Sequence, residues 1–225
     1  MANTNNSGIL FIDRNHLEYF DFSKPKPLTF NFPPSIIKDM EVLNRHDLET
    51  QLILFLNFYK LNPLPLIVVL STDICFETEI NDTVEANFEI KNNSFLELIP
   101  FEENIHKIYK LAKGYKLCAV NKELIDTFKT ILIKMGFSLA TVIPASVSGI
   151  NIKSIDAPSA SYLFAKINQL KIMSIIQAEN FSNEKQVEPK KVLGIKRIFL
   201  LLSLFLLLLL TLLYLLYQQT MVPVS

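Results

Sequence analysis

Three acidic residues, Asp73, Glu77 and Glu79, come nearest in this sequence to a set of catalytic carboxylates. Two carboxylates that share a site can act as general acid and general base. Side chains two residues apart in a strand point to the same side, so Glu77 and Glu79 would face the same way. No His or Lys partner is expected nearby. We therefore interpret these residues as a solvated face.

Residue types for nucleophilic catalysis and metal binding occur, but not in the patterns that those functions require. The serines lack the G-x-S-x-G turn of a hydrolase, and the three histidines have no metal-ligand spacing. The two cysteines fall in apolar stretches, which indicates reduced, buried thiols. These residues are Ser71, Ser146 and Ser148; His16, His46 and His106; and Cys75 and Cys118. The sequence predicts no enzyme, no cofactor and no metal site.

Charge and glycine content argue against two further classes of ligand, nucleic acid and nucleotides. Lys plus Arg and Asp plus Glu both number 22, so no global charge attracts nucleic acid. The five glycines form neither a G-x-G-x-x-G nor a P-loop pattern. We expect no nucleic-acid partner.

An apolar run over residues 198–217 predicts a transmembrane helix, because it holds no charge, proline or glycine. At about 1.5 Å per residue, this helix would be about 30 Å long, the thickness of a bilayer's hydrocarbon core. The alternative is a buried core helix, but soluble helices that are apolar all round are rarely this long.

Basic residues flank the run on one side only: Lys190, Lys191, Lys196 and Arg197. The positive-inside rule predicts that the domain before the run is cytoplasmic, so the run would be a single-pass anchor with a short non-cytoplasmic tail over 218–225. The same residues could attract anionic lipid or only set the topology. The N-terminal residues show no signal-peptide pattern. The polar stretch 179–197 reads as a juxtamembrane linker, and residues 1–7 as disordered.

The domain over 8–178 reads as a mixed α/β (α+β) fold. Apolar segments predict strands at 8–13, 17–22 and 28–32, a helix at 47–61 capped by Asn44 or Asp47, and a buried strand at 66–70. This order is β-β-β-α-β.

A more polar stretch over 72–112 reads as an insertion, with a helix from about residue 82 to Pro100 and a strand at 104–112. Its edge could accept a peptide. Gly114 turns the chain into a strand at 115–120, completing a hairpin.

The last part of the domain predicts a helix, a strand and a second helix. Asn121 caps the first helix, which ends at Gly136, and a strand follows at 137–143. Asp156 caps one continuous helix over 157–178, with Leu163, Ile167, Leu170 and Met173 along one stripe. The inner face of the first helix is predicted to hold Leu124, Ile125, Phe128, Leu132 and Ile133.

Several short motifs occur in a characteristic order. They are Phe-Ile-Asp at 11–13, Ile-Val-Val-Leu-Ser at 67–71, Ile-Pro-Phe-Glu at 99–102, Ala-Val-Asn-Lys-Glu at 119–123, Gly-Phe at 136–137 and Val-Ile-Pro-Ala at 142–145. This order resembles the first half of the actin-like cytoplasmic platform proteins of type IV pili and type II secretion, the PilM and GspL families. The resemblance covers about residues 8–175 and implies a ribonuclease-H-like lobe with an inserted subdomain.

The resemblance also implies sites and partners. Asp13 matches a metal- or phosphate-binding Asp, but Arg14-Asn15-His16 replaces the small phosphate turn that amides need to approach phosphate. A groove beside the insertion would take a partner's tail or the chain's own linker at 180–190. We expect a non-enzymatic, membrane-anchored scaffold that binds other platform proteins, with self-association left open. The alternatives are a tethered actin-like ATPase completed by dimerisation and a tail-anchored adaptor.

Overall fold

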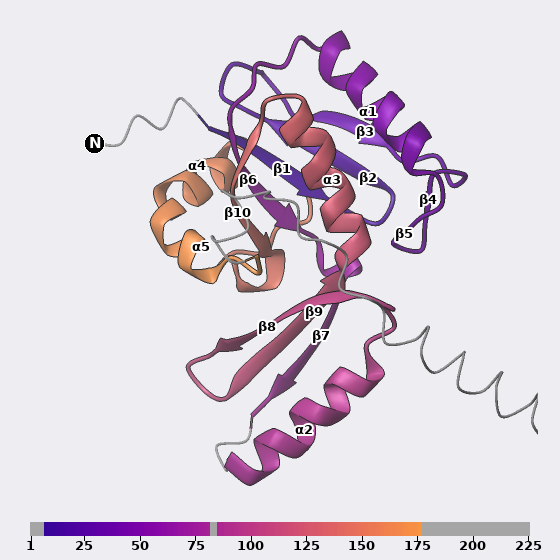
Figure 1. Ribbon diagram of the computed structural model, residues 1–225. Coiled ribbons are helices and arrows are strands. Elements are labelled where there is room, and N and C mark those ends of the chain that lie inside the picture. The colour runs from indigo at the N-terminus through magenta and orange to yellow at the C-terminus, as the bar shows by residue number, and fades with distance from the viewer. Residues whose placement is uncertain (1–6, 82–84, 177–225) are drawn as a thin grey trace, which may run out of the picture. The chain divides into compact units, whose positions relative to one another are not determined.

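The computed structural model describes residues 7–81 and 85–176, and it contains a five-stranded sheet in the order β10-β6-β1-β2-β3 (Figure 1). β1 (Gly8–Ile12), β2 (His16–Phe20) and β3 (Leu28–Asn31) form an antiparallel meander. β6 (Pro65–Leu70) pairs parallel with β1, and β10 (Ser138–Pro144) pairs parallel with β6. The mixed α/β class is confirmed, and so are the three opening strands, but two further strands lie between them and the first helix.

Alternate residues of the central strands enter two different cores. Leu10 and Ile12 face a core beneath helices α1 (Arg45–Phe58) and α3 (Lys122–Lys134). Ile9 and Phe11 face a second core beneath α4 (Ala157–Ala165) and α5 (Ile167–Met173). Because helices cover both faces of the sheet, β1 and β6 need apolar residues on both sides. This explains why both strands are continuous apolar runs.

α1 (Arg45–Phe58) confirms the first predicted helix, and Asn44 is its cap because its side chain accepts from Asp47 N at 3.1 Å. A short hairpin of β4 (Ile37–Lys38) and β5 (Glu41–Val42) precedes it and was not predicted. Two-residue strands give no sequence period to detect.

The insertion forms its own antiparallel sheet in the order β7-β9-β8. Its strands are β7 (Cys75–Ile80), β8 (Asn104–Lys110) and β9 (Tyr115–Asn121), and α2 (Glu85–Leu98) packs on one face through Phe95. The hairpin strand at 115–121 thus belongs to the inserted sheet, which extends beyond the 72–112 stretch that the sequence marked.

α3 (Lys122–Lys134) confirms the predicted helix, but one residue of its inner face was wrong. Ile133 is 49% exposed, whereas Ile131 is 2% exposed. Ile131 lies seven residues after Leu124 and three after Phe128, on the buried stripe, whereas Ile133 lies seven after Asp126, on the outer side.

The single helix predicted over 157–178 is wrong, because the structure has α4 (Ala157–Ala165) and α5 (Ile167–Met173). Asp156 caps α4 as expected. The chain leaves α5 at Ser174 because β10 takes its hydrogen bonds: Ile175 N donates to Val142 O at 2.8 Å, and Val142 N donates to Ser174 Oγ at 3.1 Å. Tertiary pairing therefore replaces the helix that the local pattern favours.

No helix among residues 7–81 and 85–176 is long and apolar enough to cross a membrane. The predicted linker at 179–197 with its four basic residues, the apolar run at 198–217 and the tail at 218–225 lie outside the described residues, as do residues 1–6.

Candidate functional site

Asp13 lies at the carboxyl edge of the parallel strands, where open α/β sheets bind their ligands. Ser71, which follows the neighbouring strand β6, donates its hydroxyl to Asp13 Oδ1, and its backbone N donates to Ile12 O at 2.9 Å. His16 Nδ1 lies 3.6 Å from Asp13 Oδ2. Both oxygens of the Asp13 carboxylate therefore have a partner within the protein.

A catalytic triad uses the residue types found at Ser71, Asp13 and His16. Their spatial arrangement, however, is not that of a triad. In a triad the imidazole stands between the hydroxyl and the carboxylate, so that it can take the hydroxyl proton. Here the carboxylate contacts both of the other groups. The arrangement ties the β1–β2 turn to β6.

Glu18 forms a second carboxylate contact nearby, and sequence reasoning did not single it out. This residue is 7% exposed, accepts from Ile155 N at 2.7 Å and from Ser154 Oγ at 2.9 Å, and lies 3.5 Å from His16 Nε2. A buried carboxylate with this many donors holds the loop before α4 against β2.

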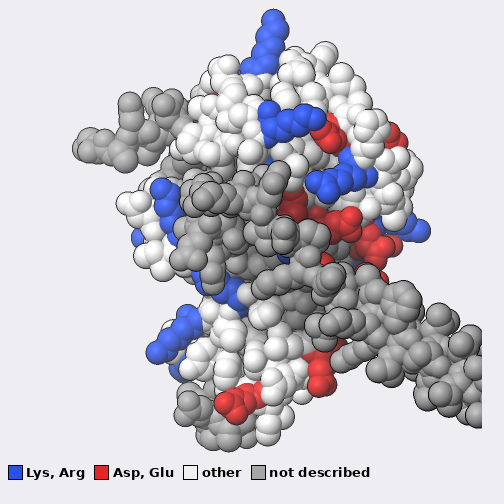
Figure 2. Space-filling model, in the orientation of Figure 1, with Lys and Arg blue, Asp and Glu red and all other residues white. Residues whose placement is uncertain are grey.

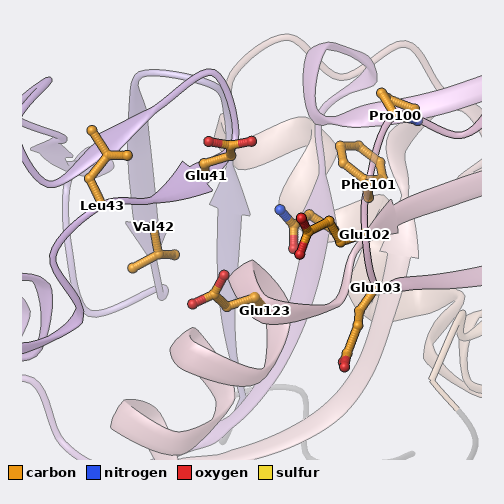
Figure 3. Close-up of a pocket in the computed structure, with 9 residues that line it drawn as sticks. Glu41, Val42, Leu43, Pro100, Phe101, Glu102, Glu103 and Glu123 are labelled. Carbon is orange, nitrogen blue, oxygen red and sulfur yellow. The ribbon is translucent and has the colours of Figure 1, made fainter. Parts of the chain in front are cut away.

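An acidic hollow of about 520 Å³ lies where the insertion meets α3 (Figure 3). Four of its nine lining residues are glutamates and none of the nine is basic. Figure 3 shows the carboxylates of Glu41 and Glu102 around one opening, whereas Glu103 points away. Lys122 pairs with Glu103 at 3.2 Å. The lining residues are Glu41, Val42, Leu43, Pro100, Phe101, Glu102, Glu103, Asn121 and Glu123.

Three chain segments build the acidic hollow, and Asn121 joins two of them. Its Oδ1 accepts from Leu124 N at 3.3 Å, which caps α3, while its Nδ2 donates to Met40 O at 3.1 Å. Met40 lies in the β4–β5 turn, where both turn residues have positive φ (50° at Asp39 and 70° at Met40). Asn121 therefore caps α3 and also holds the strained turn that comes directly before Glu41.

Electrostatics at this hollow favour a cationic ligand. Glu123 lies in the first turn of α3, where the helix dipole stabilises a carboxylate. Figure 2 shows acidic side chains gathered over β5 and the start of α3. Carboxylates accept charge-assisted hydrogen bonds from Lys and Arg, and the ring of Phe101 offers a face on which a guanidinium can stack.

Two of the sequence motifs meet at this hollow. Phe101 and Glu102 come from the Ile-Pro-Phe-Glu motif, and Asn121 and Glu123 from the Ala-Val-Asn-Lys-Glu motif. The sequence predicted a groove beside the insertion but not the contribution of Glu41, because the β4–β5 hairpin carried no signal. The order and spacing of these two motifs were the sequence signal that pointed to this hollow.

The prediction that Glu77 and Glu79 have no basic partner was wrong. Lys116, from the neighbouring strand β9, lies 3.5 Å from Glu77 and 3.0 Å from Glu79. Burial would lower the pKa of Lys116, but the hydrogen bonds and charges of Glu79 and Glu77 outweigh burial and raise it. Ser146 also donates its hydroxyl to Glu77 at 2.6 Å.

Comparisons with known proteins give structural matches only. No protein-family profile matches the chain, and no curated protein matches it. One similar structure is a PilM-PilN type IV pilus biogenesis complex, at 13% identity and a TM-score of 0.44, covering 64% of this chain and 48% of that one.

Two further structures are similar over comparable lengths. The cytoplasmic domain of EpsL, an inner membrane component of the type II secretion system of Vibrio cholerae, has 9% identity and a TM-score of 0.39 over 66% of this chain and 60% of its own. A Bacteroides thetaiotaomicron protein with an actin-like ATPase fold and unknown function has 8% identity and a TM-score of 0.38 over 64% and 54%. The chain therefore spans about half to three fifths of these solved chains.

Proposed function

We propose that this protein is a non-enzymatic scaffold that docks basic segments of partner proteins in the acidic hollow. The observation that carries the proposal is the composition of that hollow, with four glutamates and no basic residue among the nine that line it. Its location supports the same role, because two of the six motifs that suggested a platform protein contribute to its wall. The partners are other subunits of a type IV pilus or type II secretion-like assembly.

In this proposal the run at 198–217 anchors the protein in the inner membrane, with the domain on the cytoplasmic side. The support is the length and apolarity of the run and the basic residues on one flank. Anchoring confines the scaffold to the membrane surface, which raises the local concentration of membrane-bound partners. Anionic lipid near the basic flank and self-association belong to the same proposal.

The docking would be reversible and sensitive to salt. An exposed pair between a carboxylate and a cation contributes about 0.2–1 kcal/mol, so three or four such pairs contribute on the order of 1–4 kcal/mol. Screening acts over about 8 Å at physiological ionic strength, and higher salt would weaken the contact.

A labelled peptide tests this proposal. Its sequence is that of residues 186–197, which contains four basic residues and stands for basic segments in general. We expect it to bind the full-length chain in lipid nanodiscs, measured by fluorescence anisotropy, and to bind more weakly as salt increases. Removing two carboxylates, with Glu102→Gln and Glu123→Gln together, should weaken binding by a factor of about 2–30.

The matched control removes two carboxylates elsewhere, with Glu89→Gln and Glu97→Gln together. Both residues are exposed on α2 and neither lines the hollow. Binding that is equal in the two double variants, or that does not depend on salt, would overturn the docking proposal. Extraction of the protein from membranes by alkaline carbonate would separately overturn the anchor.

A second candidate function, an actin-like ATPase completed by dimerisation, rests on the position of Asp13 at the carboxyl edge of the sheet. The internal partners of its carboxylate and the absence of a small residue from the turn at 14–16 favour the scaffold. Calorimetry with ATP and magnesium distinguishes the two.

A further inference from the structure

Two cysteines and a glutamate meet on one face of the inserted sheet. Cys75 and Glu77 lie on β7, and Cys118 lies opposite Glu77 on β9. Their two sulfur atoms and the nearest carboxylate oxygen all lie within 4.8 Å of one another. Cys118 is fully buried and Cys75 is half-buried. Among the described residues, this is the one group of metal-ligand types that comes together in this way.

We propose that Cys75, Cys118 and Glu77 bind one zinc-like divalent metal ion. Thiolate ligands select zinc among the common divalent metals, and zinc accepts two sulfurs, a carboxylate oxygen and one further ligand in a tetrahedron. With Zn–S bonds of about 2.3 Å, the sulfurs of such a site stand about 3.8 Å apart. The ligand atoms, all within 4.8 Å of one another, already lie close to this spacing.

Tyr109 gives an independent sign of a missing ligand. It is 5% exposed, and its hydroxyl has no hydrogen-bond partner among the described residues. Burial, and then the nearness of Cys118, Cys75 and Glu77, raises the pKa of this hydroxyl, so it stays protonated beside the cluster. An unpaired buried hydroxyl destabilises a fold. A water molecule in the fourth metal position would give it a partner.

The charges around the cluster balance once a divalent ion is present. Two thiolates and one carboxylate carry three negative charges, which the ion and the ammonium of Lys116 neutralise. Zinc binds cysteine sulfur as the thiolate. Metal binding at these cysteines is therefore coupled to the release of protons and depends on pH.

A disulfide fits this geometry less well than a metal. Cys75 pairs with Val120 and Cys118 pairs with Glu77, so the cysteines are diagonal neighbours in the sheet. Diagonal neighbours have Cα atoms about 7–8 Å apart, beyond the usual disulfide range of about 4.4–6.8 Å.

One of the proposed ligands also contacts the turn after β10. Ser146, in the turn after β10, donates to Glu77 Oε1 at 2.6 Å and so orients a proposed ligand. Such outer contacts fix the position of a metal ligand. The ion would thus link β7 to β9 within the inserted sheet, while Ser146 holds the Glu77 carboxylate in position.

Cobalt titration of the reduced, metal-depleted full-length chain tests the proposal. We expect a thiolate-to-cobalt charge-transfer band that saturates at one equivalent and disappears when zinc is added. Cys75→Ser and Glu77→Gln should remove or strongly weaken binding, and Tyr109→Phe should weaken it by roughly ten- to a hundredfold. Glu89→Gln, at an exposed position on α2, should leave it unchanged.

A thiol count on each sample ensures that both cysteines are reduced, and circular dichroism confirms that each variant is folded. Cys75 is the preferred cysteine to replace, because the buried Cys118 also packs in the core. Failure of the wild-type chain to give the band with both thiols free would overturn the proposal. So would an unchanged band in folded Cys75→Ser.

Discussion

Replacing Ile131 by alanine should destabilise the domain far more than the same replacement at Ile133, two residues further along α3. Ile131 is 2% exposed and belongs to the core beneath α1 and α3, whereas Ile133 is 49% exposed. The two substitutions remove the same atoms from the same helix. Their difference therefore isolates burial.

The magnitude at Ile131 follows from transfer and cavity terms. Ile→Ala removes three carbon atoms from a buried site, worth about 2.4 kcal/mol at about 0.8 kcal/mol each, and a residual cavity adds to this loss. We expect a loss of about 2.5–5 kcal/mol in the free energy of unfolding. At Ile133 the smaller transfer loss is partly offset by the better helix propensity of alanine, and a net loss below about 1 kcal/mol follows.

Urea denaturation of the full-length chain in a mild detergent would measure both values. The chain has seven tyrosines and no tryptophan, so intrinsic tyrosine fluorescence or far-UV circular dichroism can report unfolding. Both variants should retain the wild-type m-value, which would show that the unfolded state is unchanged. Equal losses at the two positions would refute this description of α3.

Four further predictions concern the turns, the cap, an ion pair and the nucleotide. Gly114→Ala should unfold the inserted sheet, because φ at Gly114 is 80° and an added Cβ would lie 1.9 Å from Ile80 O. Hydrogen exchange of β8 and β9 would measure this, and native protection of these strands would contradict the prediction. Asn121→Ala should cost about 1–2 kcal/mol in urea unfolding and weaken peptide binding at the acidic hollow, whereas Asn121→Asp should retain the cap but lose the contact to Met40. The hydrogen bond and charge of Lys134 lower the pKa of Glu49, so the pair stabilises the fold above the unfolded-state pKa of Glu49, and this stabilisation is lost as the pH falls through the folded-state pKa. An NMR titration should show a higher Glu49 pKa in Lys134→Met, and an unchanged value would refute the pairing. Calorimetric titration of the full-length chain with ATP and magnesium should give no binding heat, and clear binding would favour the ATPase.

Local patterns predicted the parts of the fold that depend on neighbouring residues. The apolar run at 66–70 indicated a strand buried on both faces. In the structure β6 lies between β1 and β10, and helices cover both faces of the sheet. Asn44, Asn121 and Asp156 were identified as caps because a cap needs only its own turn. The helix over 157–178 failed because hydrogen bonds to β10 outweigh local propensity after Met173.

The candidate sites show the same difference between local features and long-range contacts. The sequence by itself determined most strands and helices outside the β4–β5 hairpin and the α4–α5 segment, together with the caps and the position of the motifs, because these depend on residue type and spacing within a few turns. Only the tertiary structure placed Glu41 beside Glu123, Lys116 beside Glu77 and Cys75 beside Cys118. The physical reason is that strand register and helix packing, summed over the whole core, decide which distant side chains meet.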